Sequence, residues 1–243
     1  MIPYLGGPIT PDSCAIRAWT GRHAFVSFAH PQQLGLAASV AQSFALDNGA
    51  YVFWKGGRPI DWTLFYAWVE IWRRHPGFDF CVIPDVIDGT EEENDALLAA
   101  CPLPRHMAAP VWHTNESLDR FARLARGYPR VCIGSSGEHD VSRVSDAVPR
   151  LKTAIRRIAD DSGRPICKLH GLRMSNPAIS TQLPLASTDS TNLARNIGLD
   201  VRWKGTYSPK SKETRALILA ERIEAYQSTD CLEPLSNNPE DLL

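Results

Sequence analysis

The chain has 243 residues, of which 44% are hydrophobic and 22% are charged, and its formal net charge at pH 7 is −1. This composition indicates a folded globular protein and excludes a largely disordered chain. No run approaches the roughly 18 uninterrupted apolar residues of a membrane-spanning helix, and Met1-Ile2-Pro3-Tyr4 does not begin an export signal, so we expect a cytoplasmic protein.

Short apolar runs rich in Val, Ile and Phe alternate with amphipathic segments of helical length, which is typical of repeated β-α units. In chain order, the predicted strands are Ala24–Phe28, Ser43–Leu46, Phe78–Ile83, Ala109–His113, Arg130–Ile133, Ile166–Leu169 and Leu185–Thr188. The predicted helices are Pro31–Ala41, Asp61–His75, Glu91–Cys101, Ser117–Gly127, Val144–Asp160, Asn176–Gln182 and Lys212–Tyr226. Thr90 and either Asn115 or Ser117 are suitable N-caps.

Seven clear strands and one less regular strand, in a chain of this length, favour a single-domain (β/α)8 TIM barrel over a doubly wound sheet. No Gly-x-Gly-x-x-Gly motif follows a predicted strand, as a dinucleotide-binding fold would require. We assign residues 1–229 to the barrel. The segment 230–243, with Pro234, Pro239 and several polar residues, is predicted to be a loose tail.

The cysteines and several tryptophans are predicted to be structural. No two of the six cysteines have the close spacing of a zinc site, so we expect neither a cysteine metal site nor disulfides: Cys14, Cys81, Cys101, Cys132, Cys167 and Cys231. Trp62, Trp68 and Trp72 have helical spacing, which favours packing of that helix on the barrel.

Charge is unevenly distributed along the chain. Between Val141 and Arg222 there are fifteen basic and seven acidic residues, an excess of eight positive charges. Such a region would attract phosphates and favours a nucleic-acid partner, although a solvated helix face explains Arg156 and Arg157 equally well.

Catalytic residues of a parallel barrel lie where its strands end. The residues that directly follow the predicted strands are Asp47, Asp85, His113, Gly134-Ser135-Ser136-Gly137-Glu138, His170-Gly171 and Asp189. If the barrel forms, these residues converge on one site.

The order of these residues resembles the tRNA-guanine transglycosylase superfamily, which is built on a (β/α)8 barrel. The family's nucleophilic aspartate is followed six positions later by Arg-Asn, as Asp189 is by Arg195 and Asn196. Its second essential aspartate opens an Asp-Ser-Gly-Gly motif, which Asp47-Asn48-Gly49-Ala50 resembles. Its base-reading aspartate corresponds to Asp85.

Two further parts of the family pattern have counterparts here. The Gly-Gly-Leu-Ala-Val-Gly-Glu loop is echoed by Gly134-Ser135-Ser136-Gly137-Glu138, and the base-binding Gln falls near His113. The family's zinc-binding cysteines are absent and the chain is shorter than typical tRNA enzymes. It is most similar to the compact phage and bacterial DpdA-type enzymes, which insert 7-deazaguanines into DNA.

This resemblance implies exchange of guanine for a 7-deazaguanine, in DNA or alternatively in tRNA, without a cofactor or metal. Asp189 is the expected nucleophile on the sugar carbon, and Asp47 the expected general acid and base. The predicted base-binding residues are Asp85, His113, Gly134, Ser135, Ser136 and Gly137. Tyr51, Phe53 or Trp54 could stack on a base. The predicted nucleic-acid contacts are Arg195, Asn196, Arg202, Lys204, Lys210 and Lys212. A homodimer or accessory modification proteins are further expected partners.

Two alternatives fit the same residues. His113 and His170, with Asp47 and Asp189, could build the metal site of an amidohydrolase-like barrel, although the usual His-x-His pair is absent. His170 could equally have a structural hydrogen-bonding role. The other alternative is a nucleic-acid-binding barrel that has lost catalysis.

Overall fold

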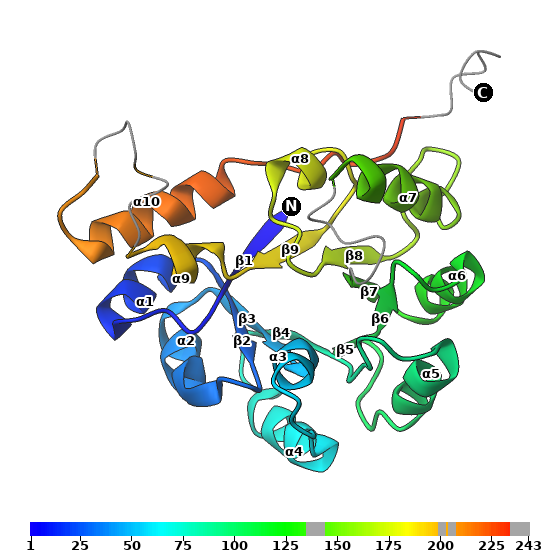
Figure 1. Cartoon of the computed structure of the whole chain (residues 1–243), viewed down its shortest axis with the longest axis horizontal. Coiled ribbons are helices and arrows are strands. Elements are labelled where there is room, and N and C mark those ends of the chain that lie inside the picture. The colour runs from blue at the N-terminus through cyan, green and yellow to red at the C-terminus, as the bar shows by residue number, and fades with distance from the viewer. Residues whose placement is uncertain (135–143, 199–202, 204–207, 234–243) are drawn as a thin grey trace.

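A computed structural model describes residues 1–134, 144–198, 203 and 208–233 of the chain. Its strands all run parallel and lie in the order β5-β4-β3-β2-β1-β9-β8-β7-β6 (Figure 1). Their bounds are β1 Ile2–Gly6, β2 His23–Ser27, β3 Ser43–Asp47, β4 Phe78–Val82, β5 Ala108–Ala109, β6 Val111–His113, β7 Arg130–Gly134, β8 Lys168–Gly171 and β9 Ser187–Ser190.

The sheet closes through Pro110. β5 pairs with β4, β6 pairs with β7, and Pro110 alone separates β5 from β6. Proline has no backbone N–H to offer a ladder, but the Pro110 carbonyl still accepts from the Cys132 N–H at 2.8 Å. β5 and β6 are therefore one interrupted strand, and the nine strands form the eight positions of the predicted single-domain (β/α)8 barrel.

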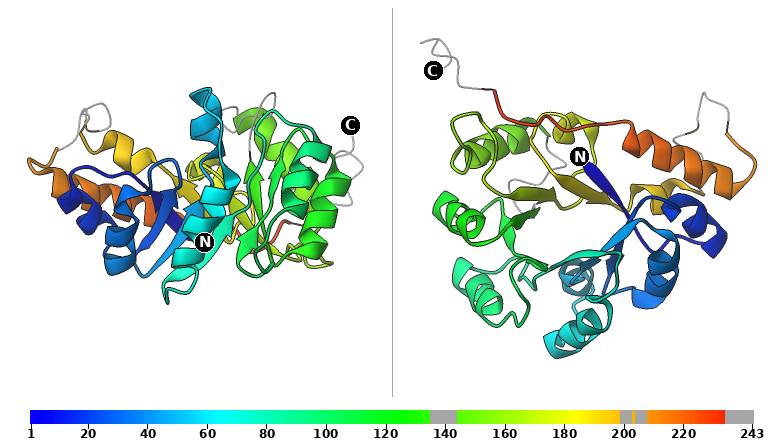
Figure 2. Two further views of the ribbon diagram at one scale, coloured as in Figure 1. Left: turned by 90° about the horizontal axis from the view of Figure 1, so that it is seen from below. Right: turned by 180° about the vertical axis from the view of Figure 1, so that it is seen from behind.

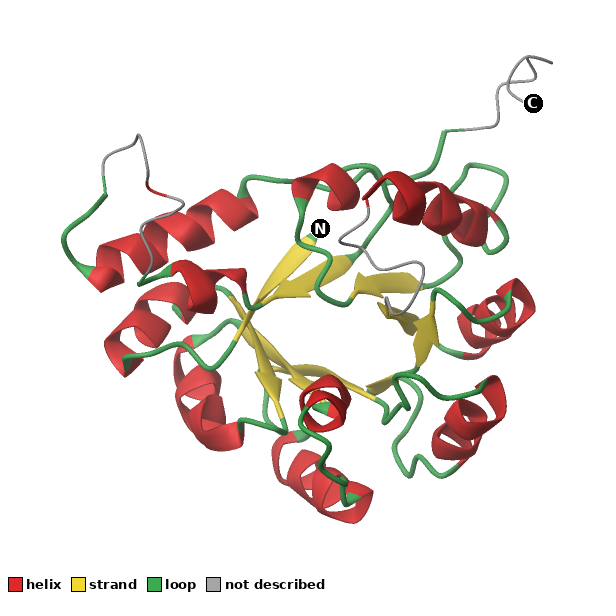
Figure 3. Ribbon diagram, in the orientation of Figure 1, coloured by secondary structure: helices red, strands yellow, loops and turns green. Residues whose placement is uncertain are grey.

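Helices surround this ring of strands (Figure 3). Their bounds are α1 Asp12–Trp19, η1 Pro31–Gln33, α2 Leu34–Val40, α3 Ala50–Lys55, α4 Trp62–Trp72, α5 Glu91–Ala99, α6 Leu118–Gly127, α7 Val144–Arg156, α8 Pro177–Ser180, α9 Asn192–Asn196 and α10 Lys212–Glu224. The last helix lies beside the first, and Ser13 donates to Glu213 at 2.7 Å (Figure 1). Within the described residues, no helix is both long and apolar enough to cross a bilayer.

The sequence signals for helix starts are present in the structure. Thr90 and Glu93 form a capping box at α5, and the Ser117 hydroxyl accepts the Arg120 N–H at α6. All seven predicted strands and all seven predicted helices have counterparts. β8 and β9 each begin two residues later than predicted. At β8, Ile166 is 53% exposed and its N–H donates to the Ile158 carbonyl rather than to a strand.

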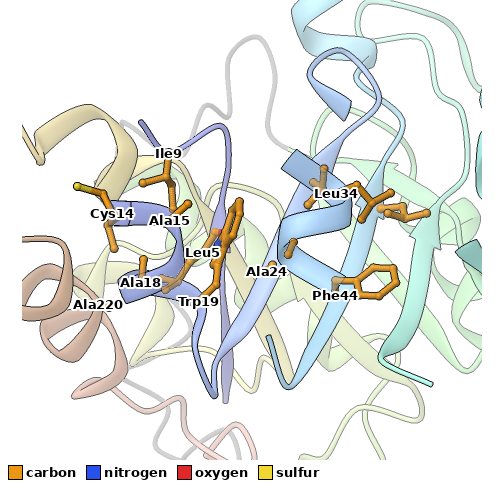
Figure 4. Close-up of a cluster of buried hydrophobic side chains, with 14 of the residues drawn as sticks. Leu5, Ile9, Cys14, Ala15, Ala18, Trp19, Ala24, Leu34, Phe44 and Ala220 are labelled. Atoms are coloured by element: carbon orange, nitrogen blue, oxygen red, sulfur yellow. The ribbon is translucent and has the colours of Figure 1, made fainter. Parts of the chain in front are cut away.

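Side chains along each strand point alternately into and out of the barrel, and this divides the core into an inner and an outer part. The barrel interior is filled by Tyr4, Phe25, Ala45, Phe80, Val82, Ala109, Val111 and Cys132. Leu5, next to Tyr4, faces outward and packs with Trp19 of α1, whose Nε1–H donates to the Leu5 carbonyl at 2.9 Å (Figure 4). Trp62, Trp68 and Trp72 pack against this outer core, as their spacing predicts.

The cysteines and the C-terminal segment were also predicted from the sequence. The six cysteines are free thiols, and Cys14, Cys81 and Cys132 are buried. The predicted loose tail begins with an attached segment, because Leu232 is buried and its N–H donates to the Gly163 carbonyl at 2.9 Å. Residues 234–243 lie outside the described part of the chain.

Candidate functional site

A cavity of about 390 Å³ lies where the carboxyl ends of the strands meet the loops that follow them. Six residues that the sequence singled out line it: Asp47, Asp85, His113, Gly134, Asp189 and Arg195. They come from five positions around the ring and from α9, so the barrel brings together residues up to 148 positions apart. Tyr51 of α3, predicted as a stacking residue, also lines the cavity.

The other predicted nucleic-acid contacts lie elsewhere or outside the described residues. Asn196 does not line the cavity, and its Nδ2 donates to the Asn192 carbonyl at 2.7 Å within α9. Lys210 and Lys212 are exposed, just before and at the start of α10, and neither lines the cavity. The residues outside the described part are Ser135, Ser136, Gly137, Arg202 and Lys204.

Asp47 ends β3 and faces the cavity beside Ser27, its register partner on β2. Burial raises the pKa of Asp47 to about 6, the hydrogen bond from Ser27 opposes this, and the charges of Asp189 and Asp85 add to it. The Gly49 N–H donates to Asp47 Oδ2 at 3.2 Å. Asp47 is therefore a carboxyl group that gains and loses its proton close to neutral pH.

Asn48 holds Asp85 in place. Its Nδ2 donates to Asp85 Oδ1 at 2.7 Å and to the Ile83 carbonyl at 2.8 Å, while its Oδ1 accepts the Ala50 N–H at 2.8 Å. Gly49, at φ +80°, takes a left-handed conformation, and a Cβ there would lie 2.9 Å from the Ala29 nitrogen. The Asp-Asn-Gly segment thus turns the chain so that Asn48 reaches across to the end of β4.

His113 completes this chain of hydrogen bonds. Its Nε2 lies 2.9 Å from Asp85 Oδ2, and both side chains are at least 90% buried. Burial lowers the pKa of His113, but the hydrogen bond and charge of Asp85, with the charge of Glu116, outweigh it, so its pKa is raised above the usual value. Nδ1, on the other side of the ring, has no hydrogen-bond partner among the described residues.

A second buried ion pair fixes the backbone of His113. Glu116 Oε2 accepts the His113 N–H at 2.8 Å and pairs with Arg120 at 2.6 Å, while Asn94 donates to Glu116 Oε1 at 3.0 Å. Burial raises the pKa of Glu116 despite these bonds. Both His113 and its partner Asp85 are therefore held by buried hydrogen bonds.

Asp189, 5% exposed, lies on β9 opposite Tyr4 of β1. Its Oδ1 accepts the Arg173 N–H at 2.9 Å and is 3.4 Å from His170 Nε2. Within the described residues, Oδ2 has no hydrogen-bond partner. One oxygen of Asp189 is thus anchored, and the other remains available to a ligand.

His170 has the structural hydrogen-bonding arrangement that the sequence left open. It is fully buried, does not line the cavity, and its Nδ1 lies 2.8 Å from the Ser187 hydroxyl. Burial lowers its pKa, against the hydrogen bond and charge of Asp189. Across the described residues, no group of three or more His, Cys, Asp or Glu side chains is arranged to hold a metal ion.

Sequence reasoning missed four polar cavity residues: Ser27, His30, Arg173 and Thr191. Arg173 is the most informative, because it has φ +58°, a conformation that non-glycine residues rarely adopt. Its N–H holds Asp189, and its guanidinium carbon lies 3.3 Å from the centroid of the Tyr51 ring. Ser27 ends β2 but lies inside the predicted strand Ala24–Phe28, so the rule that selects residues directly after a predicted strand passed over it.

Searches of protein-family models, of curated proteins and of solved structures find no match to this chain.

Proposed function

We propose that this protein is a nucleic-acid guanine transglycosylase, which exchanges guanine for a 7-deazaguanine base, in DNA rather than tRNA, through a covalent intermediate on Asp189. The observation that supports this most directly is the composition of the cavity wall. Asp47 and Asp189 face the same space as the buried Asp85–His113 pair. Two carboxylates suit bond exchange at a sugar carbon, and a neighbouring donor and acceptor suit recognition of a base.

Asp189 is the nucleophile in this proposal. Its free Oδ2 attacks C1′ of the nucleotide, the C1′–N9 bond breaks, and the bonding electrons leave with guanine. The N–H of Arg173, 2.9 Å from Oδ1, keeps the carboxylate from turning away. The product of this step is a glycosyl ester of Asp189 and a guanine anion that needs a proton.

Asp47 supplies and later removes that proton. Because its pKa is raised to about 6, a useful fraction of Asp47 is protonated near neutral pH, and its anion is still basic enough to accept a proton. It protonates the departing guanine, then takes the N9 proton of the incoming 7-deazaguanine. N9 of that base attacks C1′, the ester bond breaks, and Asp189 returns to its starting state.

Asp85 and His113 recognise the base. A guanine presents O6 as an acceptor beside the N1–H and amino donors on one edge. Asp85 accepts from the N1–H and amino donors through its remaining lone pairs, and His113, with Nε2 2.9 Å from Asp85 Oδ2, holds that carboxylate at the cavity wall. The positive charge of His113 also stabilises the negative charge that the leaving base develops on O6.

The test is transfer of radiolabelled guanine or 7-deazaguanine into single-stranded DNA, duplex DNA and tRNA. We expect incorporation into DNA by the wild type, a covalent protein–DNA band on a denaturing gel, and a loss of about 10⁴-fold or more in Asp189→Asn. Asp47→Asn should also be strongly impaired. Asp88→Asn removes an exposed carboxylate three residues after Asp85 and is the matched control.

Each other outcome has a definite meaning. Label entering tRNA instead of DNA would keep the chemistry and reverse the choice of polymer. No incorporation by the wild type into any polymer, or full activity in Asp189→Asn, would overturn the proposal.

A further inference from the structure

The segment Ala50–Arg58, here called the α3 arm, contains α3 and the two glycines that follow it. It starts directly after Gly49, and Ala50, Tyr51 and Val52 at its base line the cavity. Figure 2 shows α3 standing out from the rim of the barrel beyond the ends of the neighbouring strands. The arm therefore connects the inside of the cavity to an outer surface.

Flat side chains follow one another along this connection. The guanidinium carbon of Arg173 lies 3.3 Å from the centroid of the Tyr51 ring, and the Tyr51 and Trp54 rings are 5.7 Å apart at 42°. Trp54 is 48% exposed. Trp54 thus extends the stack from the cavity wall to a ring surface that the described residues leave open to solvent.

The charges around this stack are positive. Lys55 and Arg58 are exposed on the arm, and the Arg58 guanidinium carbon lies 5.0 Å from the Phe53 ring centroid. The whole segment 48–60 contains no acidic residue. Arg195 of α9 also lines the cavity. An exposed tryptophan between cations suits a partner that has both flat rings and negative charges.

We propose that the α3 arm is the docking surface for a single nucleic-acid strand, with the base adjacent to the reacting nucleotide stacked on Trp54. The choice of nucleic acid over a protein partner rests on the proposed function and on the positive charge of the arm. When one nucleotide enters the cavity past Tyr51, its neighbour on the same strand lies next to Trp54. Lys55 and Arg58 then contact the phosphates that flank the stacked base.

The experiment measures binding of a short fluorescein-labelled single-stranded DNA by anisotropy, with RNA of the same sequence as a second arm. Loss of one base–aromatic stack should weaken binding by Trp54→Ala about 5- to 150-fold, while Trp54→Phe should keep most of the affinity. Ile71→Ala is the matched control, because Ile71 is 74% exposed on α4, outside the arm. Lys55→Ala with Arg58→Ala should lower the salt dependence of binding.

Binding of free 7-deazaguanine, measured by calorimetry, should be unchanged in Trp54→Ala. Strand binding that Trp54→Ala leaves intact would overturn the proposal. So would a change confined to self-association in sedimentation, since the arm would then be a contact between copies of the protein. A wild type that binds strands through Trp54 but transfers no base would contradict the proposed function alone.

Discussion

His113 Nε2 lies 2.9 Å from Asp85 Oδ2, and this pair is buried at the wall of the cavity. Asn48 occupies the other oxygen of Asp85 at 2.7 Å. Each oxygen of Asp85 thus has a partner within the protein, and His113 Nδ1, on the far side of the ring, is buried without a hydrogen-bond partner among the described residues. This geometry makes the protonation state of His113 important to both stability and recognition.

The stability of the protein should depend on the charge of His113. Because its pKa is higher in the folded than in the unfolded protein, its contribution is complete below about pH 6.5 and is lost as the pH rises through the folded value. We expect His113→Gln to lower the free energy of unfolding by about 1–3 kcal/mol at pH 6.5 and by less at pH 9. Urea unfolding at both pH values measures this difference.

His106→Gln is the control for that experiment, since His106 is exposed. It should change stability little at either pH. An equal loss at pH 6.5 and pH 9 in His113→Gln would show that the ion pair with Asp85 does not stabilise the fold.

Gly134 should be required for the position of the His113 ring. A Cβ at residue 134 would lie 2.8 Å from His113 Nδ1, which is closer than side chains tolerate. Gly134→Ala should therefore destabilise the protein by about 1–3 kcal/mol and weaken binding of a guanine-type base. Thermal unfolding and calorimetric titration with 7-deazaguanine test the two effects.

Gly127→Ala provides the comparison, because a Cβ at the end of α6 meets nothing within 4 Å. We expect it to be neutral or to stabilise the protein by about 0.4–1 kcal/mol. If Gly134→Ala behaved in the same way, the close approach of the ring to Gly134 would have no energetic importance.

The backbone of Arg173 should be strained. At φ +58° a side chain costs about 1–2 kcal/mol more than glycine, so Arg173→Gly should be at least as stable as Arg173→Ala. At an ordinary helical position the order is reversed by about 1 kcal/mol. Both variants lose the stacking of the guanidinium on Tyr51. Urea unfolding of Arg173→Gly and Arg173→Ala measures the free-energy cost of the backbone conformation, because both variants lack the stacking. A clearly more stable Arg173→Ala would contradict the expected backbone strain.

The fold was predictable because its signals are local. Apolar runs and caps such as Thr90 indicate the helices and strands that are long enough to show a periodic pattern. β1 was missed as a definite strand because Pro3 interrupts its short run, and α3 was missed because its six residues follow Asp47-Asn48-Gly49 and resemble a turn. The break at Pro110 could not be foreseen either, since Ala109–His113 has a continuous strand pattern.

Residues at the ends of recognised strands were the easiest part of the site to predict. Asp47, His113 and Asp189 were found in that way. Arg173 was not found, because it lies in a loop and no local sequence pattern predicts its left-handed backbone conformation. The role of Asn48 was also missed, since its partner Asp85 is distant in sequence and becomes a neighbour only when β3 and β4 pair.

Ionised Asp47 should lower the free energy of unfolding, because its carboxylate lies in the cavity beside two other carboxylates. Its folded pKa of about 6 lies above the ordinary 3.8, so the folded protein loses stability as the pH rises from about 4 through 6 and Asp47 must ionise. Asparagine avoids this cost. Because Asp47 is partly exposed and solvent screens its charge, we expect Asp47→Asn to stabilise the protein by about 1–2 kcal/mol at pH 8 and by less at pH 4.5. Urea unfolding at both pH values, with Asp88→Asn as the exposed control, measures the effect. A loss of stability at pH 8 would mean that the hydrogen bond from Ser27 outweighs burial and the charges of Asp189 and Asp85.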